Sequence, residues 1–99
     1  MVKHIIIWNF KSELSDSEKT AAAEKIKMGL EGLSGKINGL TDIKVQNKLL
    51  DSSNGDIMLD STFTDEGSLK GYQTNPEHLK VAGFVRSVTE SRKCVDFEL

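Results

Sequence analysis

The segment Val2–Phe10 constrains the fold more than any other part of the chain, because it is typical of a β-strand that is apolar on both faces. Side chains alternate between the two faces of a strand. One face carries Val2, His4, Ile6, Trp8 and Phe10, and the other carries Lys3, Ile5, Ile7 and Asn9. Such a strand is buried on both sides, so we expect it at the centre of a sheet that is covered on each face.

A helix is expected next, since Ser15 and Glu18 have the spacing of a capping box. Its core stripe runs from Ala22 to Ile37, and three glycines weaken its second half, so we expect it to end near Ser34. Strands are expected over residues 41–50 and 57–64. A loop at 51–56 that contains Asn54-Gly55 makes the two strands antiparallel neighbours.

The last third of the chain predicts two helices and a strand. A short helix after Asp65 carries Leu69 and Tyr72, and a second helix spans residues 76–89. Asn75 can cap this second helix, and Pro76 suits its first position. The final strand is expected over residues 92–97.

This order of elements predicts an α+β fold of the ferredoxin-like type, in one domain over residues 1–99. The sheet has four antiparallel strands with the helices on one face, and right-handed crossovers place the first and third strands at its centre. The opposite face would hold Ile5, Ile7, Met58 and Val95. That face is too apolar to remain in water, so we expect a second copy of the chain to cover it and form a homodimer. Asp60 on that face could pair with Lys3 or Arg92 of either copy.

Composition argues against several kinds of partner. The 13 basic and 15 acidic residues are scattered, which does not favour nucleic-acid binding. No apolar run approaches the length of a membrane helix, and the first residues enter a strand directly, so we expect no membrane contact and a cytoplasmic location. The single cysteine, Cys94, is expected to be a small buried residue of the last strand, and Asp96 a solvated or ion-paired carboxylate.

Several short motifs resemble the stress-responsive dimeric α/β-barrel (Dabb) family over nearly the whole chain. They are Met1-Val-Lys-His4 before the apolar strand, Ser61-Thr-Phe-Thr-Asp65, Tyr72-xxx-Pro76-Glu-His78, and Val95-Asp-Phe97. The resemblance implies a homodimer in which two sheets face each other to form a barrel with the helices outside.

The resemblance also implies a pocket between sheet and helices. In a plant polyketide cyclase of the family, an aldol cyclisation without a cofactor uses polar groups that correspond to His4, Tyr72 and His78 here. Two further polar positions of the cyclase pattern are Ile57 and Ile26 in this chain. The walls of the pocket are expected to come from Ile6, Trp8, Ile26, Ile57 and Phe63.

His4, Tyr72 and His78 have chemistry that suits such a pocket. His4 lies among apolar residues and needs a hydrogen-bond partner, which Tyr72 or His78 could supply. His78 lies in the first turn of a helix, where the positive end of the helix dipole disfavours imidazolium, so a neutral His78 could act as a general base. The hydroxyl of Tyr72 could orient a carbonyl. All three side chains have an alternative interpretation as packed core residues.

Three functions fit these residues: a binding protein for a small, partly apolar or phenolic molecule, a cofactor-free acid/base enzyme of the cyclase, isomerase or lyase type, and a structural stress-linked dimer without a site. We expect no cofactor and no metal, because the two histidines have no carboxylate or thiolate at ligand spacing along the chain. Haem binding through His4 or His78, as in more distant relatives, is a further hypothesis.

Overall fold

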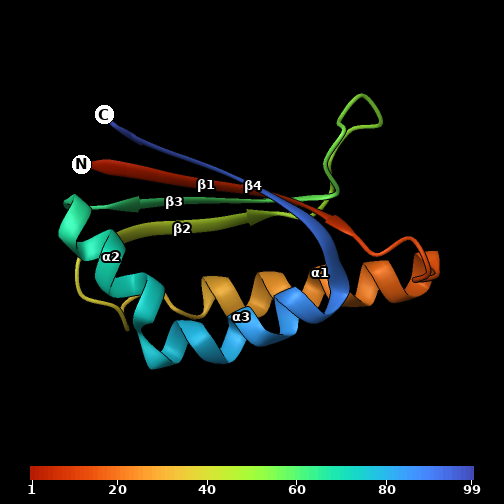
Figure 1. Ribbon diagram of the computed structural model, residues 1–99, viewed down its shortest axis with the longest axis horizontal. Helices are drawn as coiled ribbons and strands as arrows, with labels where there is room; N and C mark the ends of the chain where they lie inside the picture. Colours follow the sequence, from red (N-terminus) through yellow and green to blue (C-terminus); the bar gives the residue numbers. More distant parts are fainter.

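The computed structural model describes residues 1–99 and has the predicted ferredoxin-like arrangement, in which one antiparallel sheet carries all the helices on one side (Figure 1). The elements in chain order are β1 (Val2–Phe10), α1 (Asp16–Glu31), β2 (Leu40–Gln46), β3 (Ile57–Phe63), α2 (Glu66–Thr74), α3 (Pro76–Val88) and β4 (Thr89–Glu98). The strand order is β2-β3-β1-β4, so β1 and β3 lie at the centre as predicted.

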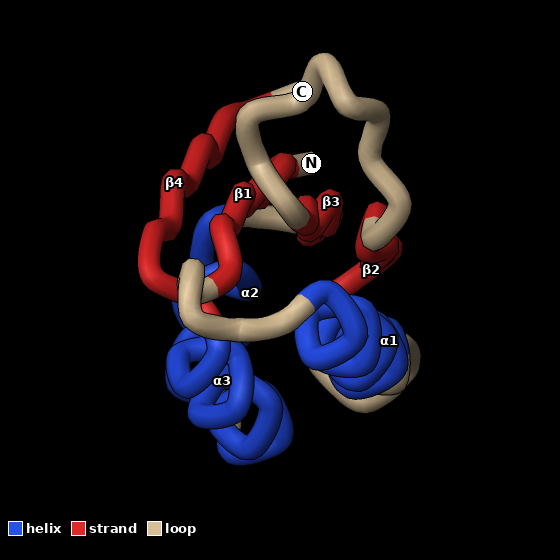
Figure 2. Tube along the Cα trace, turned by 90° about the vertical axis from the view of Figure 1, so that its right-hand side faces the viewer, coloured by secondary structure: helices blue, strands red, loops and turns tan.

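The core lies between the sheet and the helices, which all cover the same face (Figure 2). Every second residue of β1 is buried there, in agreement with the predicted face. Residues Leu59 and Phe63 of β3 and Ile26 and Leu30 of α1 complete the layer. Apolar burial of this kind contributes about 25 cal/mol per Å² removed from water, which is why the period-two pattern of β1 determines its position.

Local signals at the helix starts act as predicted. Ser15 and Glu18 form the capping box of α1, and the side chain of Asn75 accepts a hydrogen bond from the Glu77 amide at the start of α3. α1 ends at Glu31 with Gly32 as its C-cap, three residues before the predicted end. The glycines of this region therefore stop the helix earlier than its apolar stripe suggests.

Two strand boundaries differ from the predicted ones. β2 ends at Gln46, so the connection to β3 spans residues 47–56 and is longer than the turn-rich stretch alone. β4 begins at Thr89, directly after α3, and not at residue 92. The amide of Lys11 bonds to the carbonyl of Val88, which holds this helix-to-strand corner next to the end of β1.

The face of the sheet opposite the helices carries apolar side chains in contact with solvent. Val95 and Phe97 of β4 are 55% and 44% exposed, and Ile7 of β1 is also exposed. Lys3 and Asp60 form an ion pair of 2.7 Å on this face, which is one of the two partners predicted for Asp60. The loop 47–56 extends on this side, as both views show (Figures 1 and 2). No helix of the structure has the length and apolarity required to cross a membrane.

Candidate functional site

A cavity of about 380 Å³ lies between the sheet and the last two helices. Its apolar wall consists of Ile6, Trp8, Leu30, Leu59, Ala82 and Val85. Its polar groups are His4, Tyr72, Gln73, His78, Arg86 and Arg92. The volume and the mixture of an apolar wall with a few polar groups are typical of small-molecule sites.

The residues that the sequence suggested for this pocket divide into two groups. Ile6 and Trp8 line the cavity together with His4, Tyr72 and His78. Ile26, Ile57 and Phe63 lie instead in the solid core, each fully buried and away from the cavity wall. Sequence pattern identifies which face a side chain belongs to, but it does not show where that face leaves a space.

Tyr72 lies on α2, where packing against Phe63 fixes its ring at a centroid distance of 5.0 Å. The residue is 1% exposed, and its hydroxyl has no hydrogen-bond partner. Burial raises the pKa of this hydroxyl well above its usual value, so it stays protonated. An unpaired buried hydroxyl costs about 1–3 kcal/mol, which makes this group available to a ligand.

His78 lies next to Tyr72, with 4.1 Å between the two ring centroids. It occupies the first turn of α3, just after Asn75 and Pro76 set the start of the helix. Its Nδ1 atom is buried and has no hydrogen-bond partner. Burial is the main cause that lowers the pKa of His78, and nearby carbonyl groups only partly oppose it. The lowered pKa favours the neutral imidazole at pH 7, and burial is its main cause, whereas the prediction from the sequence relied on the helix dipole.

His4 is 1% exposed on the helical face of β1, and its Nδ1 atom lies 2.5 Å from Oδ1 of Asp96 on β4. The predicted partners were Tyr72 and His78, and this prediction is wrong. Antiparallel pairing sets His4 directly opposite Asp96, so the carboxylate reaches the ring first. Because an ionised carboxylate only accepts, Nδ1 donates and the lone pair of a neutral His4 resides on Nε2.

Three aromatic rings bring the polar groups of the site together. The His4 and Tyr72 ring centroids are 6.0 Å apart, and Tyr72 in turn lies against His78. The structure thus joins all three residues that the sequence suggested, with Tyr72 in the middle. The sequence analysis did not identify Gln73, Arg86 and Arg92 as pocket residues. Arg86 and Arg92 are exposed cations at the edge of the cavity, and neither forms an ion pair within 4 Å.

Cys94 is exposed, which contradicts its prediction as a buried residue. It lies on the edge strand β4, where the helices give little cover, so alternation along the strand does not bury it. Its Sγ atom is 3.8 Å from Nδ1 of His4 and 3.4 Å from Oδ1 of Asp96. Partial desolvation of the sulfur and the neighbouring Asp96 carboxylate raise the pKa of this thiol, and the Arg92 cation beside it opposes the shift.

The family model of the stress-responsive A/B barrel domain matches residues 2–99 of this chain. The chain belongs to this family. No curated protein matches the chain. Among solved structures, a dimeric ferredoxin-like protein of unknown function from Bacteroides fragilis is 31% identical, with a TM-score of 0.93 over 99% of this chain and 95% of that one. The family prediction made from the sequence is confirmed.

Two structural neighbours of this A/B barrel chain have stated activities. A hydroxynitrile lyase from Passiflora edulis is 20% identical, with a TM-score of 0.77 over 97% of this chain and 90% of that one. SnoaB, a cofactor-independent oxygenase from Streptomyces nogalater, is 11% identical, with a TM-score of 0.76 over 99% of this chain and 91% of that one. At these identities the likeness shows the fold alone.

Proposed function

We propose that this A/B barrel protein is a homodimer in which each copy holds a small, partly apolar molecule in the cavity beside His4, Tyr72 and His78. One observation carries the proposal: the Tyr72 hydroxyl and His78 Nδ1 are both buried, both unpaired and on adjacent rings of the cavity wall. Each unpaired group costs about 1–3 kcal/mol, and a ligand with one donor and one acceptor would recover that cost.

The cavity also indicates the chemistry of the ligand. A flat apolar molecule would contact Trp8 and Val85, while an oxygen substituent would bond to Tyr72. Arg86 and Arg92 at the cavity edge favour a carboxylate or an acidic phenol at the other end, since guanidinium groups bind carboxylates in a bidentate manner. A hydroxybenzoate or a β-keto acid has this distribution of groups.

A second candidate is a cofactor-free acid/base enzyme acting on the same molecule. It is favoured by the lowered pKa of His78, which burial keeps neutral and able to accept a proton. Tyr72 beside it could donate a hydrogen bond to a carbonyl or enolate oxygen, and Asp96 would hold His4 in one tautomer. Proton transfer next to a carbonyl, as in a lyase or cyclase, is the reaction that fits these groups.

The homodimer is supported by the apolar face of the sheet and by the neighbours, several of which are described as dimeric. A second copy on this face would bury Val95 and Phe97 and leave the cavity on the other side of each sheet. Each subunit would then contain a complete site.

A thermal-shift panel of hydroxybenzoates and β-keto acids tests the ligand. A compound at 100 times its Kd stabilises the folded protein by about 2.7 kcal/mol. We expect at least one compound to shift the melting temperature of the wild type and to lose this shift in Tyr72→Phe and His78→Leu. Ser87→Ala, an exposed change on α3, should keep it. Equal shifts in all four proteins would place the ligand away from Tyr72 and His78, and no shift in the wild type would favour a structural dimer without a ligand site.

A further inference from the structure

We infer that His4, Cys94 and Asp96 form a site for a divalent transition-metal ion of the zinc type, with Nδ1, Sγ and a carboxylate oxygen as its ligands. These three residues, the β1–β4 cluster, come from two adjacent strands. His4 lies opposite Asp96 in the antiparallel ladder, and Cys94 is two residues before Asp96 on the same face. The spacing along the chain conceals this set, which is why the sequence did not suggest a metal.

The distances in the cluster are close to those of a metal site. Its three ligand atoms lie within 4.8 Å of one another. A tetrahedral zinc ion with bonds of about 2.0–2.3 Å separates its ligand atoms by about 3.3–3.6 Å. The separations involving Cys94 Sγ are 3.8 Å to Nδ1 and 3.4 Å to Oδ1. Only the pair His4–Asp96, at 2.5 Å, has to open, by about 1 Å.

Rotation of the Asp96 side chain provides this opening without a change in the backbone. The Asp96 side chain is 39% exposed and has room to rotate, whereas the His4 side chain is only 2% exposed and is held by its neighbours. The rigid histidine on the central strand therefore fixes the position of the ion, and the two residues of the edge strand adjust to it. A ligand set of nitrogen, sulfur and oxygen suits zinc or cobalt better than calcium or magnesium, which prefer oxygen alone.

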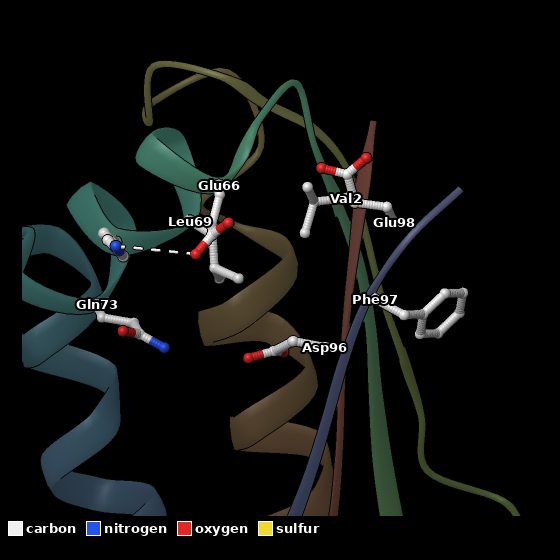
Figure 3. A pocket seen from close by; sticks show the side chains of 8 residues that line it. Val2, Glu66, Leu69, Gln73, Asp96, Phe97 and Glu98 are labelled. Atoms are coloured by element: carbon white, nitrogen blue, oxygen red, sulfur yellow. Dashed lines mark ion pairs between the residues drawn. The ribbon is translucent and has the colours of Figure 1, made fainter.

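A fourth ligand position would be open to the hollow between α2 and β4. Asp96 lines this hollow together with Gln73 and Leu69. Figure 3 shows the side chains of Gln73 and Asp96 pointing toward one another across it. An open fourth position of this kind holds water or a small ligand in catalytic zinc sites, whereas structural zinc sites are closed by four protein ligands.

Metal binding also has a proton balance. His4 donates from Nδ1 to Asp96 in the metal-free protein, so an ion bound at Nδ1 requires the other tautomer, in which the neutral imidazole carries this proton on Nε2. The Cys94 thiol loses its proton to solvent as the Sγ–metal bond forms. Affinity should therefore rise with pH, and no oxidation or reduction is involved.

The metal site does not depend on the proposed ligand. Cys94 and Asp96 are absent from the wall of the cavity that Tyr72 and His78 share, so changes at these two residues leave that wall intact. A protein that binds the ion but no aromatic acid, or the reverse, would separate the two proposals. His4 belongs to both, and Asp96 acts on the cavity only through its hydrogen bond to His4.

Titration of the untagged, reduced protein with Co²⁺ tests the site. We expect one ion per chain, visible d–d bands of a four-coordinate site and a near-ultraviolet thiolate-to-cobalt band, all displaced by Zn²⁺. Cys94→Ala should lose the near-ultraviolet band, and Asp96→Ala should weaken binding by at least about tenfold. Asp42→Ala, an exposed carboxylate on β2, is the matched control and should bind as the wild type does.

Two results would overturn the inference. One is the absence of a thiolate-to-cobalt band in the wild-type protein when circular dichroism of the same sample shows that the protein is folded. The other is a band and an affinity that are unchanged in both Cys94→Ala and Asp96→Ala. Because Cys94 is exposed, its replacement by Ala should preserve folding, so a lost band reports the ligand and not the fold.

Discussion

Asp96 accepts a hydrogen bond from His4 across the β1–β4 ladder, and this contact of 2.5 Å ties the edge strand of the sheet to its centre. The histidine is buried and the carboxylate is partly exposed. A partly exposed carboxylate therefore supplies the hydrogen-bond acceptor that the buried Nδ1 atom of His4 requires. The strength of this contact, and that of the other polar contacts of the site, can be measured one at a time.

Asp96→Ala should lower the free energy of unfolding by about 1–3 kcal/mol, because it leaves the buried Nδ1 of His4 without an acceptor. Urea denaturation at a fixed protein concentration gives this value. Asp96→Asn should recover part of the loss, since an amide oxygen can still accept from Nδ1. A change below 0.5 kcal/mol, equal to that of the exposed Asp42→Ala, would show that the contact contributes nothing.

Tyr72→Phe should not destabilise the ligand-free protein and should stabilise it by up to about 1 kcal/mol. The hydroxyl has no hydrogen-bond partner, so its removal takes away a desolvation cost and leaves the ring packing unchanged. Thermal and urea unfolding both measure this. A loss greater than 1 kcal/mol would mean that the hydroxyl has a partner, for example an ordered water molecule.

The free energy of unfolding should fall as the pH drops below 6.5, which is the unperturbed pKa of the His78 side chain. Burial lowers the pKa of His78 in the folded state, so the unfolded chain binds a proton there that the folded chain does not. The loss grows until the pH reaches the lowered pKa. His78→Leu should reduce this slope, measured by urea unfolding between pH 7.5 and 5. An unchanged slope would place the proton uptake at other groups.

Gly39→Ala should destabilise the protein by more than about 1 kcal/mol, the usual cost of the left-handed conformation for a residue with a Cβ atom. Gly39 has a φ of +84°, and a Cβ there would collide with the side chain of Ser68. Gly83→Ala in α3 is the matched change, since its Cβ would meet open space. That variant should gain about 0.5–1 kcal/mol.

Val95→Lys should convert the proposed dimer to a monomer, because it places a charge on the apolar face of the sheet. Light scattering at micromolar concentration measures the mass. Met28→Lys is the control, since Met28 is 74% exposed on the helical side of the molecule. If the wild type is itself a monomer, the homodimer proposal fails.

Periodicity and capping signals were sufficient to predict most of the fold. The alternation of β1 identified a central strand, and the Ser15 and Asn75 caps identified where α1 and α3 begin. Each of these signals depends on residues that are close together in the chain, so a single sequence is sufficient to identify it. The helix end at Glu31 and the strand end at Gln46 were less accurate, because tertiary packing decides where a weak helix or strand stops.

The site was predictable only where it depends on local position. His4, Tyr72 and His78 were correctly assigned to their elements, and the structure brings them to one cavity. The partner of His4 was not found, because it depends on the register of two strands at opposite ends of the chain. The alternation of Cys94 and Asp96 on the final strand was the available signal, had the two strands been aligned as an antiparallel pair.

Asp96 is 92 residues away from His4 along the chain, which gives their contact a further meaning. A pair so distant forms only after every residue from His4 to Asp96 has been synthesised and the entropy cost of closing this loop has been met. A nascent chain or a C-terminally clipped product would hold an unpaired histidine and an open edge on β1. Whether the His4 ring is paired with Asp96 therefore reports whether β4 has joined the sheet. A signal from this ring could be used to follow that step during translation.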